Sequence, residues 1–301
     1  MAATRPSYYG AFFWITLLSF SVPLVVAARA FHEVKLTTKP TPHPDASGVD
    51  HALWDYLLKS YVSSGLVDYD GMKRDHLFRV YLRQLAAADL SKLTTAADQL
   101  ALLCNAYNAF VIDGVITHKI DDSVMNYSQD GKEFFDIEEH IFAGSTVSLN
   151  SIEHELIRKR FREPRIHVAL VCAARSCPAI RPEAYIGPRL AQQLDDQSIQ
   201  FANSEKYVQF DELGNKLMVS PLLNWYGDDW QPVGGFLPWL AERIRDAHLV
   251  QRIKKASEGQ VEVGFLDYDW SLNSQAPTSS REGVATPAKK AEFGSGSIPN
   301  E

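Results

Sequence analysis

Apolar residues recur at helical spacing through the first part of the chain. In the stretch 51–62 the apolar positions are Leu53, Trp54, Leu57, Leu58 and Tyr61. This i, i+3, i+4 spacing is typical of an amphipathic helix, and the stretch 75–90 repeats it. The longest helical candidate is the stretch 95–120. These patterns predict three helices before residue 121.

The stretch 95–120 carries a start signal and an apolar stripe. Thr95 and Asp98 have the spacing of a capping box. The stripe consists of Leu100, Leu103, Cys104, Tyr107, Val111 and Val115. Because Cys104 lies inside this stripe, we interpret it as a small buried apolar residue.

Two asparagines lie one turn apart beside that stripe. Asn105 and Asn108 are surrounded by apolar neighbours, and a half-buried amide needs hydrogen-bond partners. One interpretation is that they tie neighbouring loops to the helix. The other is that one of them orients a catalytic group or a substrate.

The second part of the chain mixes helical and strand patterns. The stretch 151–162 predicts a helix, with Asn150 as N-cap, Glu153 completing a capping box and Pro164 preventing its continuation. The apolar run 165–174 is typical of a central strand. We further expect a hairpin, a loop, a helix and a last strand at 207–220, 221–230, 234–244 and 261–273. The fold class is therefore α+β: a single domain of several helices around a small, largely antiparallel sheet.

The two ends of the chain do not show the pattern of a packed domain. Within residues 1–30, positions 1–10 carry one Arg, a long apolar run follows, and small residues flank Arg29, which together are typical of a signal peptide or a signal anchor. Residues 31–48 form a Pro-rich linker, and residues 274–301 have the composition of a disordered tail. The predicted domain is 49–273. Both N-terminal interpretations put it outside the cytoplasm, periplasmic or secreted, with membrane contact only through an uncleaved anchor.

Charge and cysteine count narrow the possible functions. The net charge is -7 and no long basic run occurs, which argues against nucleic-acid binding. Three cysteines are too few for a disulfide scaffold. A site built from His154, Cys172 and Cys177 has no metal-ligand spacing. We therefore expect neither a metal nor another cofactor.

The stretch "RIHVALVCAARSCP" holds the candidate thiol chemistry. In a strand, His167 lies too far from Cys177 and points away from Cys172, so we interpret it as a core or supporting histidine. A helix at 151–162 running antiparallel to that strand brings its start near both thiols. His154 is then a candidate base and Glu153 a candidate orienting group or acid. Their bland alternatives are a surface histidine and a helix-capping carboxylate.

Cys177 is the candidate nucleophile. The order Ser176–Cys177–Pro178 suits the start of a helix, where the dipole favours a thiolate, and Arg175 acts in the same direction. The alternatives are a disulfide between Cys172 and Cys177, two inert thiols, or redox exchange between them. We leave these open.

Six motifs in order resemble a known family. They are "GLVDYDGM", "CNAYNAF", "SLNSIEHELIRKRF", "RIHVALVCAARSCPAI", "VSPLLNWYGDDW" and "FLDYDWSLN". Together they resemble the DUF547 domain family over about residues 49–273; this resemblance implies a bacterial envelope or secreted protein but no defined reaction. The family's motif positions fall on Asn105, Tyr107, Asn108, Glu153, His154, Arg165, His167, Cys172, Ser176, Cys177, Pro178, Trp225, Tyr226, Asp269 and Trp270. Val171 and Cys104 depart from the family's usual Asn and aliphatic residue.

Two function classes follow. The first is a thiol-dependent hydrolase or acyltransferase acting on peptide-like or γ-glutamyl substrates, in which Cys177 attacks, His154 accepts the proton and Glu153, Asn105 or Asn108 orients the imidazole. The second is a non-catalytic envelope module with structural or disulfide-bonded cysteines. It would bind an envelope component through an aromatic cluster of Trp225, Tyr226, Trp230 and the "YDW" at 268–270.

Overall fold

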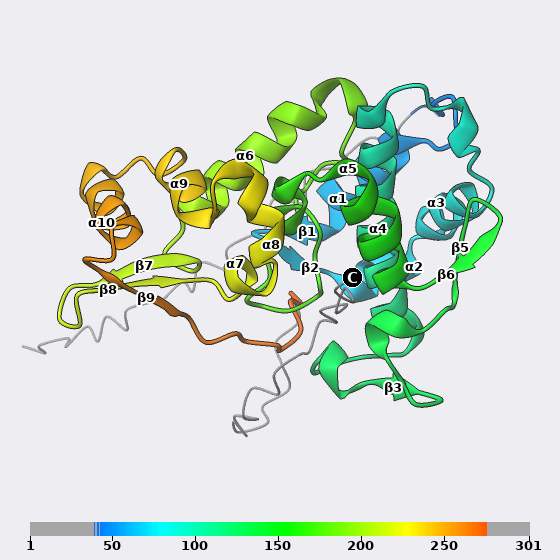
Figure 1. Cartoon of the computed structure of the whole chain (residues 1–301). Helices are drawn as coiled ribbons and strands as arrows, with labels where there is room; N and C mark the ends of the chain where they lie inside the picture. The colour runs from blue at the N-terminus through cyan, green and yellow to red at the C-terminus, as the bar shows by residue number, and fades with distance from the viewer. Residues whose placement is uncertain (1–38, 40, 42, 276–301) are drawn as a thin grey trace, which may run out of the picture. The chain divides into compact units, whose positions relative to one another are not determined.

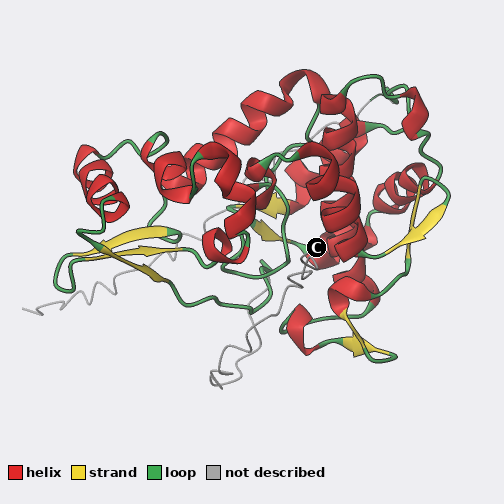
Figure 2. Cartoon of the chain, viewed as in Figure 1, coloured by secondary structure: helices red, strands yellow, loops and turns green. Residues whose placement is uncertain are grey.

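The computed structural model describes residues 39, 41 and 43–275. The predicted signal segment, most of the linker and the tail after Gln275 lie outside the described residues. Hydrogen-bonded structure runs from His43, whose backbone N–H donates to the Asp50 carboxylate, to Gln275, whose backbone N–H donates to the Val67 carbonyl. Figure 2 shows that helices predominate and that the strands are short, which confirms the α+β class.

The first helices surround a central one (Figure 1). Three helices, α1 (His51–Tyr61), α2 (Tyr69–Arg74) and α3 (His76–Ala86), precede the central α4 (Ala96–Thr117). Asp50, Asp68 and Asp75 cap the first three through their carboxylates. The helices predicted at 51–62, 75–90 and 95–120 are thus confirmed.

Helix α4 is buried on nearly all sides rather than along one stripe. Its start is capped as predicted: the Thr95 hydroxyl accepts the Asp98 backbone N–H at 3.0 Å. Cys104 is fully buried, as expected. In the described part of the chain, α4 alone has the length and hydropathy of a membrane span, but 83% of its most apolar window is buried inside the domain. Burial in a protein core explains that composition.

The strands form hairpins and one small sheet. Three antiparallel pairs are β1–β2 (Val62–Ser63 and Leu66–Val67), β3–β4 (Ser128–Gln129 and Lys132–Glu133) and β5–β6 (His140–Phe142 and Ser145–Val147). The three-stranded sheet has the order β7 (Val208–Asp211), β8 (Lys216–Val219) and β9 (Glu262–Phe265). The predicted hairpin is the antiparallel β7–β8 pair. The predicted last strand exists but pairs in parallel with β8.

A second apolar core covers this sheet. The helices around it are α6 (Leu190–Ala202), α7 (Leu222–Trp225), α8 (Gly227–Trp230), α9 (Phe236–Ala241) and α10 (Ala247–Ser257). The ring centroids of Trp230 and Trp239, two buried residues of this core, lie 4.6 Å apart. In Figure 1 the sheet lies with α9 and α10 at the end of the domain away from α3. The prediction of a loop at 221–230 was wrong. This segment forms two short helices, α7 and α8, whose apolar side chains pack in this core.

The predicted strand at 165–174 was also wrong. Pro164–Val168 is a 3₁₀ helix, opened by the Glu163 carboxylate accepting the Arg165 backbone N–H, and an irregular segment follows. The run is apolar because it is buried between other elements, and a short apolar run does not distinguish a strand from any other buried segment.

The helix predicted at 151–162 exists with a different geometry. Ser151–Arg158 is a π-helix, and α5 (Lys159–Phe161) continues it. The capping box of Asn150 and Glu153 was wrong: Asn150 has helical backbone angles and its amide donates to Asp136. The hydroxyl of Ser148 accepts the Ser151 backbone N–H instead. π-Helices are rare and often occur at functional sites.

A matched pair of leucines tests the core assignment. Leu103 of α4 is fully buried, whereas Leu213, at the tip of the β7–β8 hairpin, is fully exposed. Leu103→Ala should lower the free energy of unfolding by about 2–5 kcal/mol through the cavity it leaves. Leu213→Ala should change it by less than about 0.5 kcal/mol. Urea unfolding of both variants measures this, and equal losses would contradict the assignment.

Candidate functional site

The segment that carries Cys172 is held on one side by α4. The Asn108 amide donates to the Ala169 carbonyl at 3.0 Å and accepts the Val171 backbone N–H at 3.0 Å. All of this is buried. One side chain thus satisfies two backbone groups immediately before the thiol and fixes the path of the chain there.

On its other side the segment pairs with the end of the described chain. The Arg175 backbone N–H donates to Ser271, and the Asn273 N–H donates to Ala173. Between these two bonds, Ala174 and Leu272 form an antiparallel bridge. Ala173 has a φ of 62°, in the left-handed region that a residue with a Cβ rarely adopts. The turn directly after Cys172 is therefore strained and kept in place by its neighbours.

Cys172 and Cys177 are free thiols in hydrogen-bonding contact. The Cys172 backbone N–H donates to the Cys177 sulfur at 2.9 Å. The Cys172 sulfur lies 3.2 Å from the Tyr268 hydroxyl. Burial raises the pKa of Cys172, but hydrogen bonds from Cys177, Tyr268 and the Ala174 backbone N–H outweigh burial and lower it. Cys172 is half-buried and is the thiol that more readily ionises.

Cys177 has the opposite character. It is buried, and burial together with the hydrogen bond and charge of Cys172 raises its pKa well above the ordinary value. Its carbonyl accepts hydrogen bonds from the Lys206 ammonium at 3.1 Å and the Tyr207 hydroxyl at 3.0 Å. The predicted helix start at Cys177 was wrong, because Pro178 leads into an irregular segment that reaches to Gly187. No helix dipole favours its thiolate.

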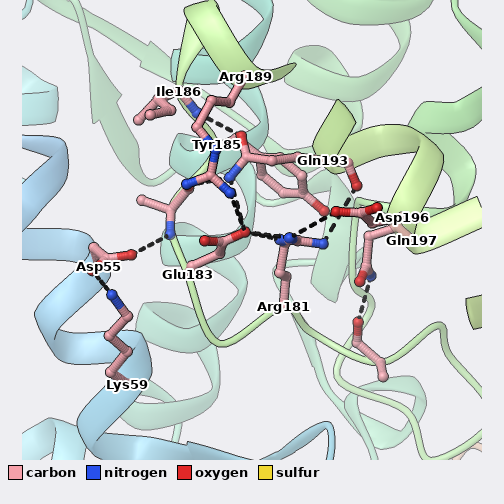
Figure 3. A network of polar contacts seen from close by, with 12 residues as sticks. Asp55, Lys59, Arg181, Glu183, Tyr185, Ile186, Arg189, Gln193, Asp196 and Gln197 are labelled. Atoms are coloured by element: carbon pink, nitrogen blue, oxygen red, sulfur yellow. Dashed lines mark hydrogen bonds and ion pairs between the residues drawn. The ribbon is translucent and has the colours of Figure 1, made fainter. Parts of the chain in front are cut away.

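A polar network replaces that helix (Figure 3). Arg181 lies between the carboxylates of Glu183 and Asp196 and pairs with both. The Gln193 side chain of α6 donates to the Ala184 carbonyl at 2.8 Å. Charged and amide groups, rather than intrahelical bonds, hold the chain that follows Pro178.

Glu153 lies on the π-helix with its carboxylate buried near the Cys172 thiol. It is 5% exposed and accepts hydrogen bonds from the Tyr107 and Tyr226 hydroxyls. Its charge opposes ionisation of Cys172 and favours protonation of His167. The hydroxyls of two tyrosines offset the cost of burying this carboxylate. Glu153 therefore does more than cap the start of a helix.

A second polar group adjoins Glu153 through Tyr226. The ring of His167 stacks on Tyr226 at 3.7 Å, and its Nε2 lies 2.7 Å from Asp229 Oδ2. Arg158 donates two hydrogen bonds to the same carboxylate, at 2.6 and 2.9 Å. Burial lowers the pKa of His167 despite Asp229 and Glu153, so its imidazole is neutral near pH 7.

The structure brings some of the predicted site residues together, separates His154 from the thiols and gives the others a supporting role. The structure places Cys177 in contact with Cys172, and Glu153 close enough for its charge to act on both Cys172 and His167. The predicted pairing of His154 with the thiols was not found: its Nδ1 accepts from Arg158 at 2.9 Å instead. The antiparallel helix–strand geometry on which that pairing depended does not exist.

Among the supporting residues, the two asparagines act as ties to loops. Asn105 makes reciprocal bonds with the Tyr185 backbone, at 2.7 and 2.9 Å, as Asn108 does beside Cys172. The Arg175 backbone N–H donates to the Ser271 carbonyl, and the charge of Arg175 is among the causes that lower the pKa of Lys206. Asn105 and Arg175 therefore support the surrounding loops.

Sequence reasoning missed the partners that come from distant segments. Tyr107 was predicted as part of the apolar stripe, and Tyr226 and Tyr268 only as members of an aromatic cluster, whereas Arg158 and Asp229 were not singled out. The sequence offers only a weak signal for these partners. Asp229 lies three residues after the Trp225–Tyr226 pair, and Tyr268 lies between two acidic residues near the end of the domain. Trp225, Tyr268 and Trp270 also form a half-buried aromatic cluster, with ring centroids 4.6–5.9 Å apart.

No metal cluster in the described chain accounts for these residues. Within residues 43–275 no group of three or more His, Cys, Asp or Glu has metal-binding geometry. A hollow of about 280 Å³ borders Pro178, Lys206 and Tyr207. Its lining does not include Cys172, so we place the candidate site at the thiol and not in the hollow.

The described chain is thus an α+β protein with a buried thiol–carboxylate site. Residues 90–202 match the family model described as "Protein of unknown function, DUF547". The match confirms the resemblance to this family over α4, the π-helix, both thiols and α6, a shorter range than 49–273. Neither the curated proteins nor the solved structures include a match to this chain.

The two hydrogen bonds by which Asn108 holds the segment before Cys172, here called the Asn108 clamp, yield a prediction with a control on the same helix. Asn108→Ala leaves buried groups at Ala169 and Val171 unsatisfied and should cost about 1–3 kcal/mol of stability. Asn105→Ala breaks two similar bonds and should cost about the same. Only Asn108→Ala should change the alkylation rate of Cys172, measured by mass spectrometry of iodoacetamide-treated folded protein. A rate unchanged from that of the wild type would contradict the clamp.

Tyr268 supplies a pH-dependent prediction. Tyr268→Phe removes a hydrogen bond that lowers the pKa of Cys172, so the midpoint of its alkylation profile should move to higher pH. Less thiolate is then present at pH 7, and labelling there should be several-fold slower. Tyr127→Phe, whose hydroxyl bonds to His118, is the control. Superimposable profiles for wild type and Tyr268→Phe would refute the role of Tyr268.

Proposed function

We propose that this protein is a thiol-dependent hydrolase or acyltransferase with Cys172 as nucleophile. One observation carries the proposal: of two thiols in contact, the half-buried Cys172 accepts hydrogen bonds that lower its pKa and lies within reach of the charge of buried Glu153. Cys177 was the nucleophile predicted from sequence. Its burial and raised pKa make it the poorer attacking group.

Glu153 takes the proton-transfer role in this proposal. As the Cys172 sulfur bonds to a substrate carbonyl carbon, the thiol proton passes to the Glu153 carboxylate. When the carbon–nitrogen bond breaks, Glu153 returns that proton to the leaving amine and a thioester remains on Cys172. Water, or a second amine, then cleaves the thioester.

The His167–Asp229 pair holds Tyr226 in place beneath Glu153. The imidazole is fixed at Nε2 by Asp229, and its face covers the Tyr226 ring. The role predicted for a histidine base thus becomes a positioning role for His167, exerted through Tyr226. His154, bound to Arg158, belongs to the outer part of this network.

The substrates we propose are peptide-like or γ-glutamyl amides outside the cytoplasm. Support comes from the apolar N-terminal segment, which lies outside the described residues, and from the chemistry of a thiol that forms thioesters with amides. The aromatic cluster of Trp225, Tyr268 and Trp270 adjoins the thiol through Tyr268 and suits an apolar substrate group.

The same aromatic cluster supports a second candidate, a non-catalytic binding module. In that case the half-buried rings bind an envelope component, and the thiols with Glu153 only maintain the fold. The two candidates differ in one respect: a binding module tolerates loss of the Cys172 sulfur.

Amide cleavage by thiol variants tests the proposal. Purified protein lacking residues 1–30 is incubated with a γ-glutamyl anilide and a short peptide anilide, and aniline release is followed. Cys172→Ala should reduce release by about 10³-fold or more, and Glu153→Gln by about 10²–10⁴-fold. Cys104→Ala, which removes a buried thiol of α4 that has no role in the proposed reaction, should leave it unchanged.

A thioester on Cys172, trapped at low pH and found by mass spectrometry, would support the mechanism. Full activity in Cys172→Ala would refute it. Binding of the anilides without release, equal in wild type and Cys172→Ala, would favour the binding module.

A further inference from the structure

The two thiols are arranged for more than nucleophilic attack. The Cys172 backbone N–H holds the Cys177 sulfur at 2.9 Å, and the two side chains are hydrogen-bonded to each other. Lys206 and Tyr207 fix the backbone carbonyl of Cys177 from the other side. The buried sulfur therefore stays beside Cys172 while the rest of the segment is anchored to α4 and to residues 269–273.

The two sulfurs also differ in what reaches them. Cys172 is half-buried, whereas Cys177 is 3% exposed and Cys104, the third cysteine, is 0% exposed. A small oxidant thus meets Cys172 first. Oxidation of cysteine follows thiolate character and exposure, and a second thiol in contact captures the first product before further oxidation.

We propose that Cys172 is an oxidative modification site and that Cys177 is its resolving thiol. The oxidant is a hydroperoxide. The proposal concerns the covalent state of the two sulfurs, and only its regulatory consequence depends on the function proposed above.

The reaction proceeds in two balanced steps. In the first, the Cys172 thiolate attacks one peroxide oxygen, a sulfur–oxygen bond forms, and the oxygen–oxygen bond breaks. The sulfur becomes a sulfenic acid, and the leaving oxygen takes a proton to become water or an alcohol. In the second, the Cys177 sulfur attacks the Cys172 sulfur, a disulfide forms, and the hydroxyl leaves as water with the Cys177 proton. A dithiol reductant reverses the result.

The first step prepares the second. The charge and hydrogen bond of Cys172 are among the causes that raise the pKa of Cys177. A sulfenic acid is neutral, so its formation removes that charge and lets Cys177 ionise more easily. Resolution is therefore favoured only after Cys172 has been oxidised.

The consequence for the proposed activity is a reversible block. A disulfide removes the Cys172 thiolate, so amide cleavage stops until a reductant restores it. It also stops oxidation at the disulfide, short of the irreversible sulfinic acid.

Mass spectrometry of peroxide-treated protein tests the proposal. Reduced full chain is treated with hydrogen peroxide, quenched with N-ethylmaleimide and digested. The wild type should contain a peptide pair linked through Cys172 and Cys177, which dithiothreitol separates. Cys177→Ser should instead accumulate sulfinic acid at Cys172, at least several-fold above the wild type. Cys172→Ser should leave Cys177 reduced, and Cys104 should be unmodified in all three.

The possible failures can be told apart. Sulfinic acid at Cys172 in the wild type, at the level of Cys177→Ser, would overturn the role of Cys177. Oxidation of Cys104 at the same rate as Cys172 would overturn the assignment of Cys172 as the oxidised site. If the disulfide forms normally but the protein cleaves no anilide, the redox proposal is supported and the proposed hydrolase or acyltransferase activity is contradicted.

Discussion

The site depends on one constraint: a segment with little regular hydrogen bonding is buried between two parts of the fold. Buried backbone groups must be satisfied, and here the Asn108 amide satisfies two of them from α4. Residues 269–273 satisfy others from the opposite side. Because both supports are specific, the turn after Cys172 can hold Ala173 at a positive φ. That turn brings Cys177 back against Cys172.

The electrostatics follow from this burial. Inside the domain a charge needs donors, and the structure supplies three to the Cys172 sulfur: a thiol, a phenol and a backbone N–H. Glu153 has two phenols, and Asp229 has Arg158 and His167. Each potential anion therefore has its own donors. Tyr226 joins two of these groups, since its hydroxyl bonds to Glu153 and its ring stacks on His167.

The sequence predicted the elements that depend on local signals. Helices α1, α3 and α4, the Thr95 cap and the β7–β8 hairpin follow from periodicity, capping and turn residues, whereas the short helix α2 was not predicted. The apolar run 165–174 was predicted as a strand. It is apolar because it is buried, and hydrogen bonds to Asn108 determine its conformation. Pro178 suggested a helix start, but Arg181 and its carboxylate partners hold an irregular segment. The parallel pairing of β9 is equally non-local.

The residues of the site were partly predictable for the same reason. Glu153 stands out because a carboxylate in apolar surroundings is unusual, and Cys172 and Cys177 stand out because two thiols lie five residues apart. Their partners come from Tyr107, Tyr226 and Tyr268, and tyrosines among apolar residues do not stand out. His154 was chosen through a helix–strand geometry that the fold does not have, and a π-helix shifts which residues share a face.

The asymmetry of the two thiols follows from their burial and from their contact with each other. The Cys172 backbone N–H and the Tyr268 hydroxyl both favour a Cys177 thiolate, but burial and the neighbouring Cys172 outweigh these donors and raise the pKa of Cys177. Ionising it beside a charged Cys172 would place two anions in contact at a buried position, which Coulomb repulsion and desolvation both oppose. Only one of the two sulfurs is therefore charged at a time, and the geometry selects the half-buried one. The order of events at this pair is fixed by the same physics, whether the first electrophile is a carbonyl or a peroxide.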